Sequence, residues 1–147
     1  MRAFADSSTL VKIYADEEGA VEARSLDLVI VSAVSRVEVP SALWRKCSDG
    51  TLSELSADLL TREFLADLSG TPGGNFQLMV AVPVTAEILD SAGKLVRTHR
   101  LRSLDAIQLA SALRAREGDA RCQTFSTYDR QLGRAALLEG FTPFPSS

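Results

Sequence analysis

Short apolar segments alternate with longer segments of helical character, and this alternation predicts an α/β protein. We expect a three-layer α/β/α sandwich around a central, mainly parallel sheet. Residues 28–31, Leu-Val-Ile-Val, form a continuous apolar run of strand length, which is typical of a parallel strand buried on both faces. The chain of 147 residues suits one domain with a substantial core, which we place at residues 1–147.

Each expected element follows from apolar spacing and from residues that start or stop helices. Ser7 and Ser8 can cap a helix after the first strand, and Asp49-Gly50 can end a later one. The expected strands are residues 2–6, 28–31, 122–126 and 141–144, with another inside 76–84. The expected helices are residues 9–15, 17–27, 33–47, 53–68, 85–98, 105–117 and 129–138, and residues 70–75 form a predicted loop.

Composition narrows the class of protein. Hydrophobic residues make up 46% of the chain and charged residues 24%, as in ordinary globular proteins. The longest apolar run, residues 78–84, contains Pro83 and is too short to span a membrane, and no secretory signal is visible. We therefore expect a cytoplasmic protein without a membrane segment. Cys47 and Cys122 lack the spacing of a zinc site.

Positive charge is concentrated in one part of the chain. The net charge is −3, yet residues 94–134 carry nine Lys and Arg against four Asp and Glu. Such a basic segment can attract a polyanion locally, or it can be a solvated helical face.

Four acidic residues stand at predicted junctions between strands and helices. Asp6 and Asp129 follow strands, whereas Glu38 and Asp105 lie early in helices. Sites in open parallel sheets form beyond the carboxyl ends of the strands, so we expect the four carboxylates to lie at one edge of the sheet. Gathered there, they would repel one another unless a divalent cation lay between them.

Each acid also has an ordinary explanation. Asp6 and Asp129 can cap helices, and Asp105 is favoured by the helix dipole in a first turn. Glu38 can form a capping box with Ser35. However, Glu38 shares its expected helix face with small and apolar residues, and a partly buried charge there needs a partner or a metal. This favours a functional role for Glu38.

Apolar residues of the helices expected at residues 33–47 and 53–68 have three possible uses. Trp44, Leu59 and Leu60 can serve the core, a dimer contact or a groove for a partner. We expect most of them in the core.

Four segments, one around each acid, occur in order along nearly the whole chain. They are Phe4–Tyr14, Val31–Leu43, His99–Ala110 and Phe125–Asp129. Together they resemble the motifs of PIN-domain proteins, and more closely those of the VapC toxins of bacterial type II toxin–antitoxin systems. Gln108 departs from the pattern, because many relatives have histidine after Asp-Ala-Ile.

The resemblance implies a PIN-like fold and an endoribonuclease that uses Mg²⁺ or Mn²⁺ to hydrolyse RNA phosphodiester bonds with a metal-activated water. Asp6 and Asp105 would be the principal metal ligands, and Asp129 would ligate directly or through water. Glu38 would hold the metal's water or position the nucleophile. The resemblance also implies a homodimer and a VapB-type antitoxin as partner.

Further residues could support this chemistry. Ser7 and Thr127 can donate hydrogen bonds that orient the carboxylates. The basic residues before Asp105 could hold RNA phosphates beside the metal, or form a solvated loop. They are Arg97, His99, Arg100 and Arg102.

Two other interpretations of the acids remain. The first is another Mg-dependent α/β phosphohydrolase or a receiver-type protein, which also places acids at strand ends. Haloacid-dehalogenase phosphatases require Asp-x-Asp after the first strand, but here Ser8 stands at the second position, and the paired acid of receiver domains is also absent. A non-catalytic interaction module with the same fold is the second alternative.

Overall fold

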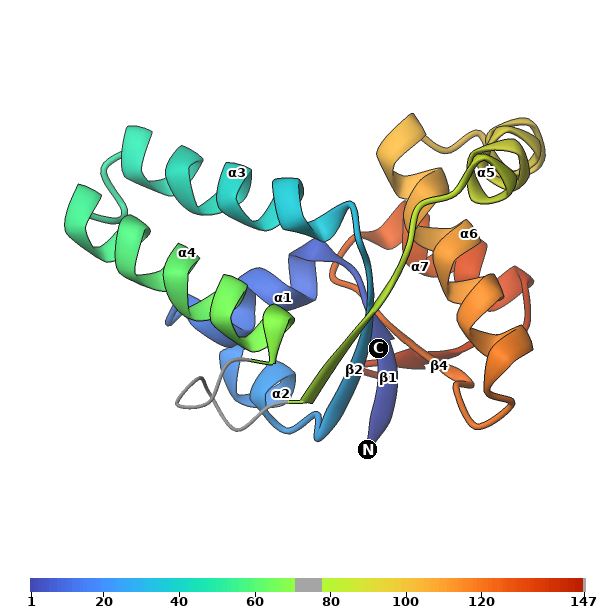
Figure 1. Cartoon of the computed structure of the whole chain (residues 1–147), viewed down its shortest axis with the longest axis horizontal. Coiled ribbons are helices and arrows are strands. Elements are labelled where there is room, and N and C mark those ends of the chain that lie inside the picture. Colours follow the sequence, from blue (N-terminus) through green and yellow to red (C-terminus); the bar gives the residue numbers. More distant parts are fainter. Residues whose placement is uncertain (71–77, 147) are drawn as a thin grey trace.

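The structure is a computed structural model that describes residues 1–70 and 78–146 (Figure 1). At Leu78 it describes the backbone but not the side chain. Most of the loop predicted at residues 70–75, and the first residues of the segment 76–84, lie outside the described part.

Strands and helices alternate along the described chain as predicted. The strands are β1 (Arg2–Ala5), β2 (Leu28–Ser32), β3 (Leu78–Val82), β4 (Thr124–Ser126) and β5 (Thr142–Phe144). The helices are α1 (Ser7–Tyr14), α2 (Ala20–Arg24), α3 (Ser35–Ser48), α4 (Glu54–Ser69), α5 (Ala86–His99), α6 (Ser103–Gly118) and α7 (Arg130–Leu138).

All neighbouring strands pair in parallel, in the order β3-β2-β1-β4-β5. The chain builds the sheet outward from β1 to β3 on one side and then returns to add β4 and β5 on the other. The strand order therefore reverses between β1 and β4, and ligands of open α/β sheets bind at such a reversal. Asp6 follows β1 and Asp129 follows β4 by three residues, so both lie beside this point.

Two apolar cores cover the two faces of the sheet, which confirms the three-layer sandwich. Because side chains alternate along a strand, Phe4 and Ile30 face the core formed with α5, α6 and α7. Ala3, Val29 and Val31 face the core formed with α1 to α4. Figure 1 shows these two groups of helices on opposite sides of the strands.

Four details differ from the predictions. The first helix begins at Ser7 and is capped by Asp6, so Ser7 and Ser8 lie inside it and do not cap it. The helix predicted at 17–27 forms only over α2, because Gly19 before it has a left-handed backbone with φ of 91°. The strand predicted at 122–126 begins at Thr124. Trp44 and Leu59 are not core residues: they are 39% and 54% exposed on α3 and α4, because helical spacing shows which residues share a face but not whether a neighbour covers it.

Within the described residues, no helix has both the length and the apolar character needed to cross a membrane.

Candidate active site

Asp6 lies at the carboxyl end of the central strand and is 3% exposed. Its backbone N–H donates to the Ser126 carbonyl at 3.1 Å, which continues the pairing of β1 with β4. Oδ1 accepts hydrogen bonds from Ser8 Oγ at 2.7 Å and from the Thr9 backbone N–H at 3.1 Å. Oδ2 accepts one from Thr127 Oγ1 at 2.6 Å. Asp6 is therefore the cap of α1 and also the most deeply buried of the four acids.

Thr127 links Asp6 to Asp129. Its hydroxyl donates to Asp6 and accepts the backbone N–H of Asp129 at 2.9 Å. The Asp129 carboxylate accepts the Leu132 backbone N–H at 2.9 Å and so caps α7. The cap uses Oδ1 of Asp129, so the helix-cap explanation and a role at the sheet edge are compatible for this residue.

Glu38 and Asp105 lie half-buried in the first turns of α3 and α6. Glu38 accepts a hydrogen bond from Gln108 Nε2 at 2.7 Å on Oε1 and one from Ser7 Oγ at 3.3 Å on Oε2. Gln108 also donates to Ser35 Oγ at 3.3 Å, and no side chain caps the start of α3. The alternative capping box between Ser35 and Glu38 is therefore not formed.

The pKa values of three of the acids are raised. Burial raises the pKa of Asp6 to about 6, against the hydrogen bonds from Thr127, Ser8 and Thr9, and the charge of Glu38 adds to the rise. Burial and the charge of Asp105 raise the pKa of Glu38. Burial and the charge of Asp129 raise the pKa of Asp105. Repulsion thus runs from Asp6 through Glu38 and Asp105 to Asp129, so the structure brings the four acids into one electrostatic group.

This group fits a divalent cation in its chemistry. Carboxylate oxygens are ligands for hard cations, and a cation bound among these acids would offset both their burial and their mutual repulsion. Among the described residues, no three His, Cys, Asp or Glu side chains stand close enough together to hold one metal ion. Magnesium commonly takes one or two protein carboxylates and completes its shell with water and substrate oxygens. The donor set suits that open kind of site, not a closed protein cage.

Of the predicted basic residues, three are exposed and one is not. Arg97, Arg100 and Arg102 are exposed near the end of α5 and the start of α6. The charge of Arg102 also lowers the pKa of Asp105, against the stronger effects of burial and Asp129. The side chain of His99 is only 8% exposed, and its Nε2 lies 2.7 Å from Glu139 Oε2.

Three residues next to the acids were not predicted as part of the site. Ser8 donates to Asp6, Gln108 donates to Glu38, and the backbone N–H of Tyr128 donates to Ser8 Oγ at 2.9 Å. Gln108 carried a signal in the sequence, because it is a lone amide in the segment Ala-Ile-Gln-Leu-Ala. Ser8 was predicted only as a helix cap, and nothing local distinguished Tyr128.

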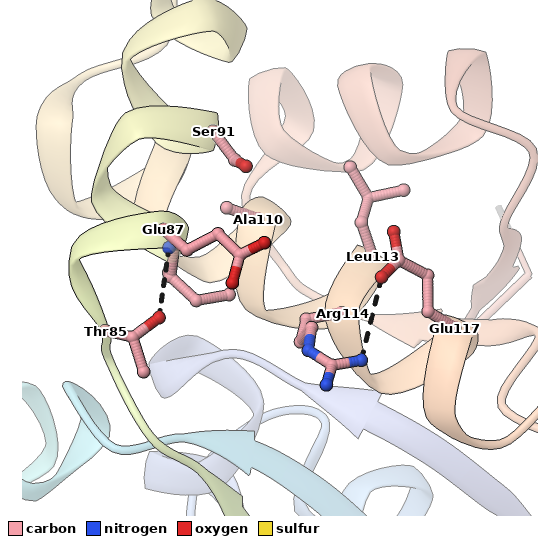
Figure 2. A pocket seen from close by; sticks show the side chains of 8 residues that line it. Thr85, Glu87, Ser91, Ala110, Leu113, Arg114 and Glu117 are labelled. Atoms are coloured by element: carbon pink, nitrogen blue, oxygen red, sulfur yellow. Dashed lines mark hydrogen bonds and ion pairs between the residues drawn. The ribbon is translucent and has the colours of Figure 1, made fainter.

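A pocket of about 150 Å³ lies elsewhere, between α5 and α6 (Figure 2). Its polar lining includes Glu87, Ser91 and an ion pair between Arg114 and Glu117 at 3.6 Å. None of the four acids lines it, so it is separate from the edge of the sheet that carries them.

Comparison with known families decides the classification. The model of the PIN domain family matches residues 3–138. The chain belongs to the PIN domain family. Two relatives from Mycobacterium tuberculosis, Ribonuclease VapC45 of strain CDC 1551 / Oshkosh and Ribonuclease VapC49 of strain H37Rv, are each 30% identical over 145 residues. Each alignment covers 96% of this chain and 93% of the relative, so the chain is a PIN-domain protein of the VapC type, as its motifs predicted.

Solved structures agree on the fold. VapC20 of Mycobacterium tuberculosis, described as a sarcin–ricin loop cleaving toxin, superposes with a TM-score of 0.60 and 16% identity over 95% of this chain and 96% of that one. PAE2754 of Pyrobaculum aerophilum gives a TM-score of 0.60 and 17% identity, covering 97% and 83%. At these identities the likeness confirms the PIN fold.

Proposed function

We propose that this PIN-domain protein is the toxin of a type II toxin–antitoxin pair and acts as a metal-dependent endoribonuclease. The observation that carries the proposal is the position of Asp6. It is a buried carboxylate at the point where the strand order reverses, and it lies within the electrostatic influence of Glu38, the next of the four acids. That its VapC45 and VapC49 relatives are named ribonucleases supports the same conclusion.

The four acids divide the work by position. Asp6 and Asp105 would be the principal ligands for Mg²⁺ or Mn²⁺, and Asp129 would reach the ion through water, because no three acids of the described residues stand close enough to hold one ion directly. A bound cation of this kind lowers the pKa of a coordinated water and neutralises charge that develops on the phosphate. Glu38 orients the attacking water, and Ser7 and Gln108 fix its carboxylate for that task. Thr127 and Ser8 hold Asp6 in the same way.

The exposed arginines give the RNA a place beside the acids. Arg102 immediately precedes α6, three residues before Asp105, and Arg97 and Arg100 lie near the end of α5. We assign to these three the contacts with substrate phosphates. His99, whose side chain is 8% exposed and lies against Glu139, offers the RNA less surface than the three arginines do.

The VapC type of the protein also indicates its protein partners. We propose a VapB-type antitoxin and a second copy of this chain as protein partners in the cytoplasm. Exposed apolar side chains on α3 and α4 support the use of these helices in such contacts. They are Val37, Trp44, Leu55 and Leu59, exposed by 70%, 39%, 79% and 54%.

The test is cleavage of total RNA by the purified chain with Mg²⁺ or Mn²⁺, compared with Asp105→Asn. We expect at least a ~100-fold loss of rate in the variant, equivalent to roughly 2.7 kcal/mol of transition-state stabilisation. Asp90→Asn, at an exposed position of α5, is the matched control and should cleave normally. Cleavage that persists in EDTA or in Asp105→Asn contradicts the assignment, and a folded wild type that cleaves no RNA favours the non-catalytic module.

A further inference from the structure

Tyr128 lies in the loop between β4 and α7, between Thr127 and Asp129. These two neighbours connect the loop to the acidic group. The side chain of Tyr128 reaches the connection between α1 and α2, where its hydroxyl donates to the Gly19 carbonyl at 3.1 Å. The ring packs directly on Gly19: a Cβ atom there would lie 2.9 Å from Tyr128 Cε1. Gly19 also has a positive φ of 91°. The absence of a side chain at Gly19 is therefore what lets the ring approach.

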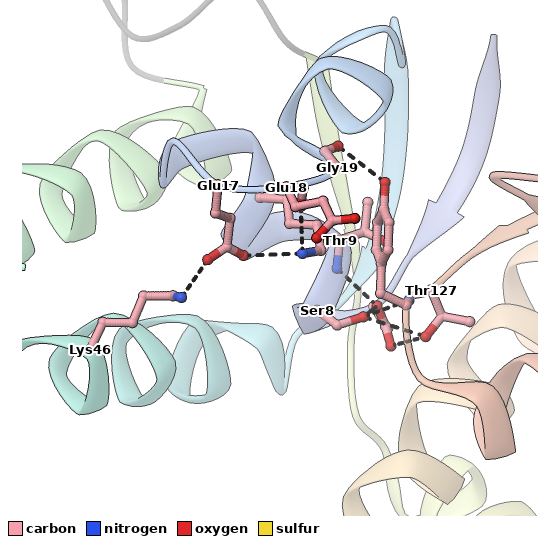
Figure 3. A network of polar contacts seen from close by, with 10 residues as sticks. Ser8, Thr9, Glu17, Glu18, Gly19, Lys46 and Thr127 are labelled. Atoms are coloured by element: carbon pink, nitrogen blue, oxygen red, sulfur yellow. Dashed lines mark hydrogen bonds and ion pairs between the residues drawn. The ribbon is translucent and has the colours of Figure 1, made fainter. Parts of the chain in front are cut away.

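Charged residues close around this ring. Lys12 Nζ lies 4.6 Å from the centroid of the Tyr128 ring, which is within the range of a cation–π contact. The same ammonium donates to the Glu18 carbonyl at 2.8 Å and to Glu17 Oε1 at 3.3 Å. Lys46 of α3 bonds the other oxygen of Glu17. Figure 3 shows the bonds that link Lys46 and Glu17, and separately the bonds made by Ser8 and Thr127.

The loop held in this way supplies or supports two of the three donors to Asp6. Thr127 Oγ1 donates to Asp6 at 2.6 Å, and Ser8 Oγ, which donates at 2.7 Å, itself accepts the Tyr128 backbone N–H at 2.9 Å. Hydrogen bonds of these lengths are lost when the donor moves by about 1 Å. The position of residues 127–129 thus sets the orientation of the Asp6 carboxylate.

We propose that Tyr128 is a positioning residue for the acidic site, acting through its contacts with Gly19 and Lys12. This clamp, defined as Tyr128, Gly19 and Lys12, holds residues 127–129 in the place where Asp6 is oriented to bind a divalent cation. The inference deepens the proposed function and rests on its metal site.

The test is the dissociation constant of Mn²⁺ for the full-length chain, measured by calorimetry well below the melting temperature. Tyr128→Ala removes the ring, and Gly19→Ala leaves every side chain of the site in place but intrudes on the ring. We expect both to weaken Mn²⁺ binding by about 10-fold or more, the usual effect of losing a residue that orients a ligand. Tyr128→Phe keeps the ring against Gly19 and beneath Lys12, and should stay within about threefold of the wild type.

Tyr14→Phe is the control for a purely structural effect. Tyr14 Oη donates to the buried Asp67 at 2.6 Å, outside the acidic group, so its loss should lower the melting temperature and leave Mn²⁺ affinity unchanged. The proposal is overturned if Tyr128→Ala and Gly19→Ala behave like Tyr14→Phe, or if the wild type binds no Mn²⁺. RNA cleavage is measured separately, because a wild type that binds Mn²⁺ without cleaving RNA refutes the ribonuclease and leaves the clamp testable.

Discussion

Replacing Asp6 by Asn should stabilise the metal-free protein at neutral pH. The carboxyl group is 3% exposed, and burial raises its pKa from 3.8 to about 6. For an acid whose pKa is raised on folding, the stabilising contribution is complete below the unfolded value and is lost as pH rises through the folded value. At pH 7.5 the ionised Asp6 therefore lowers the free energy of unfolding by roughly 3 kcal/mol. This follows from about 1.4 kcal/mol for each unit by which the folded pKa exceeds the unfolded pKa.

Asparagine recovers most of that free energy. Its amide oxygen can keep the hydrogen bonds from Ser8 and Thr9, while its NH₂ group faces Thr127, whose hydroxyl must turn to accept it. Allowing for this rearrangement, we expect a gain of about 1–3 kcal/mol at pH 7.5. For a domain of this size that corresponds to a rise in melting temperature of roughly 3–10 °C.

Thermal unfolding in EDTA and in 1 mM Mn²⁺, from pH 4 to pH 8, measures these effects. In EDTA the wild type should lose stability between about pH 4 and pH 7, and the loss should be smaller in Asp6→Asn, since Glu38 and Asp105 still carry raised pKa values. Mn²⁺ should raise the melting temperature of the wild type only. An Asp6→Asn variant that melts no higher than the wild type in EDTA, together with a wild type indifferent to Mn²⁺, would refute the reasoning.

Three further predictions concern the surroundings of the site. Gln108→Leu removes the donor to Glu38, so RNA cleavage should fall by about 10-fold or more and the free energy of unfolding by about 1–2 kcal/mol; cleavage at the wild-type rate would contradict this role. Burial raises the pKa of Glu17, but its bonds with Lys46 and Lys12 outweigh burial and lower the pKa overall. Glu17→Gln should therefore reduce the free energy of unfolding by about 0.5–1 kcal/mol at pH 7 and by little at pH 3, measured by urea unfolding. An equal reduction at both pH values would exclude the ion pairs as the cause. Arg102→Gln should weaken RNA binding and reduce the salt slope by about one, with Arg62→Gln on α4 as the unaffected control.

The pattern of apolar residues was enough to predict the elements and the layers. The run at residues 28–31 forms the interior strand β2 because it is apolar on both faces, and the strand–helix alternation predicted a parallel sheet. The prediction failed over residues 17–27, where a glycine with positive φ interrupts the helix. It also failed for the burial of Trp44 and Leu59, because burial depends on what packs against a helix.

The four acids could be located from the sequence because strand ends and helix starts are local features, and a parallel sheet brings them to one edge. Of their hydrogen-bond partners, Ser7 and Thr127 were expected from the sequence as donors, whereas Gln108, Ser8 and Tyr128 were not. Gln108 meets Glu38 across 70 residues, Thr127 meets Asp6 across 121, and Tyr128 meets Gly19 across 109. Hydrogen bonds over such separations depend on which strand lies beside which. Which donor meets which carboxylate was therefore decided by the tertiary structure, and for Asp6 it was the pairing of β4 with β1 that brought Thr127 beside it.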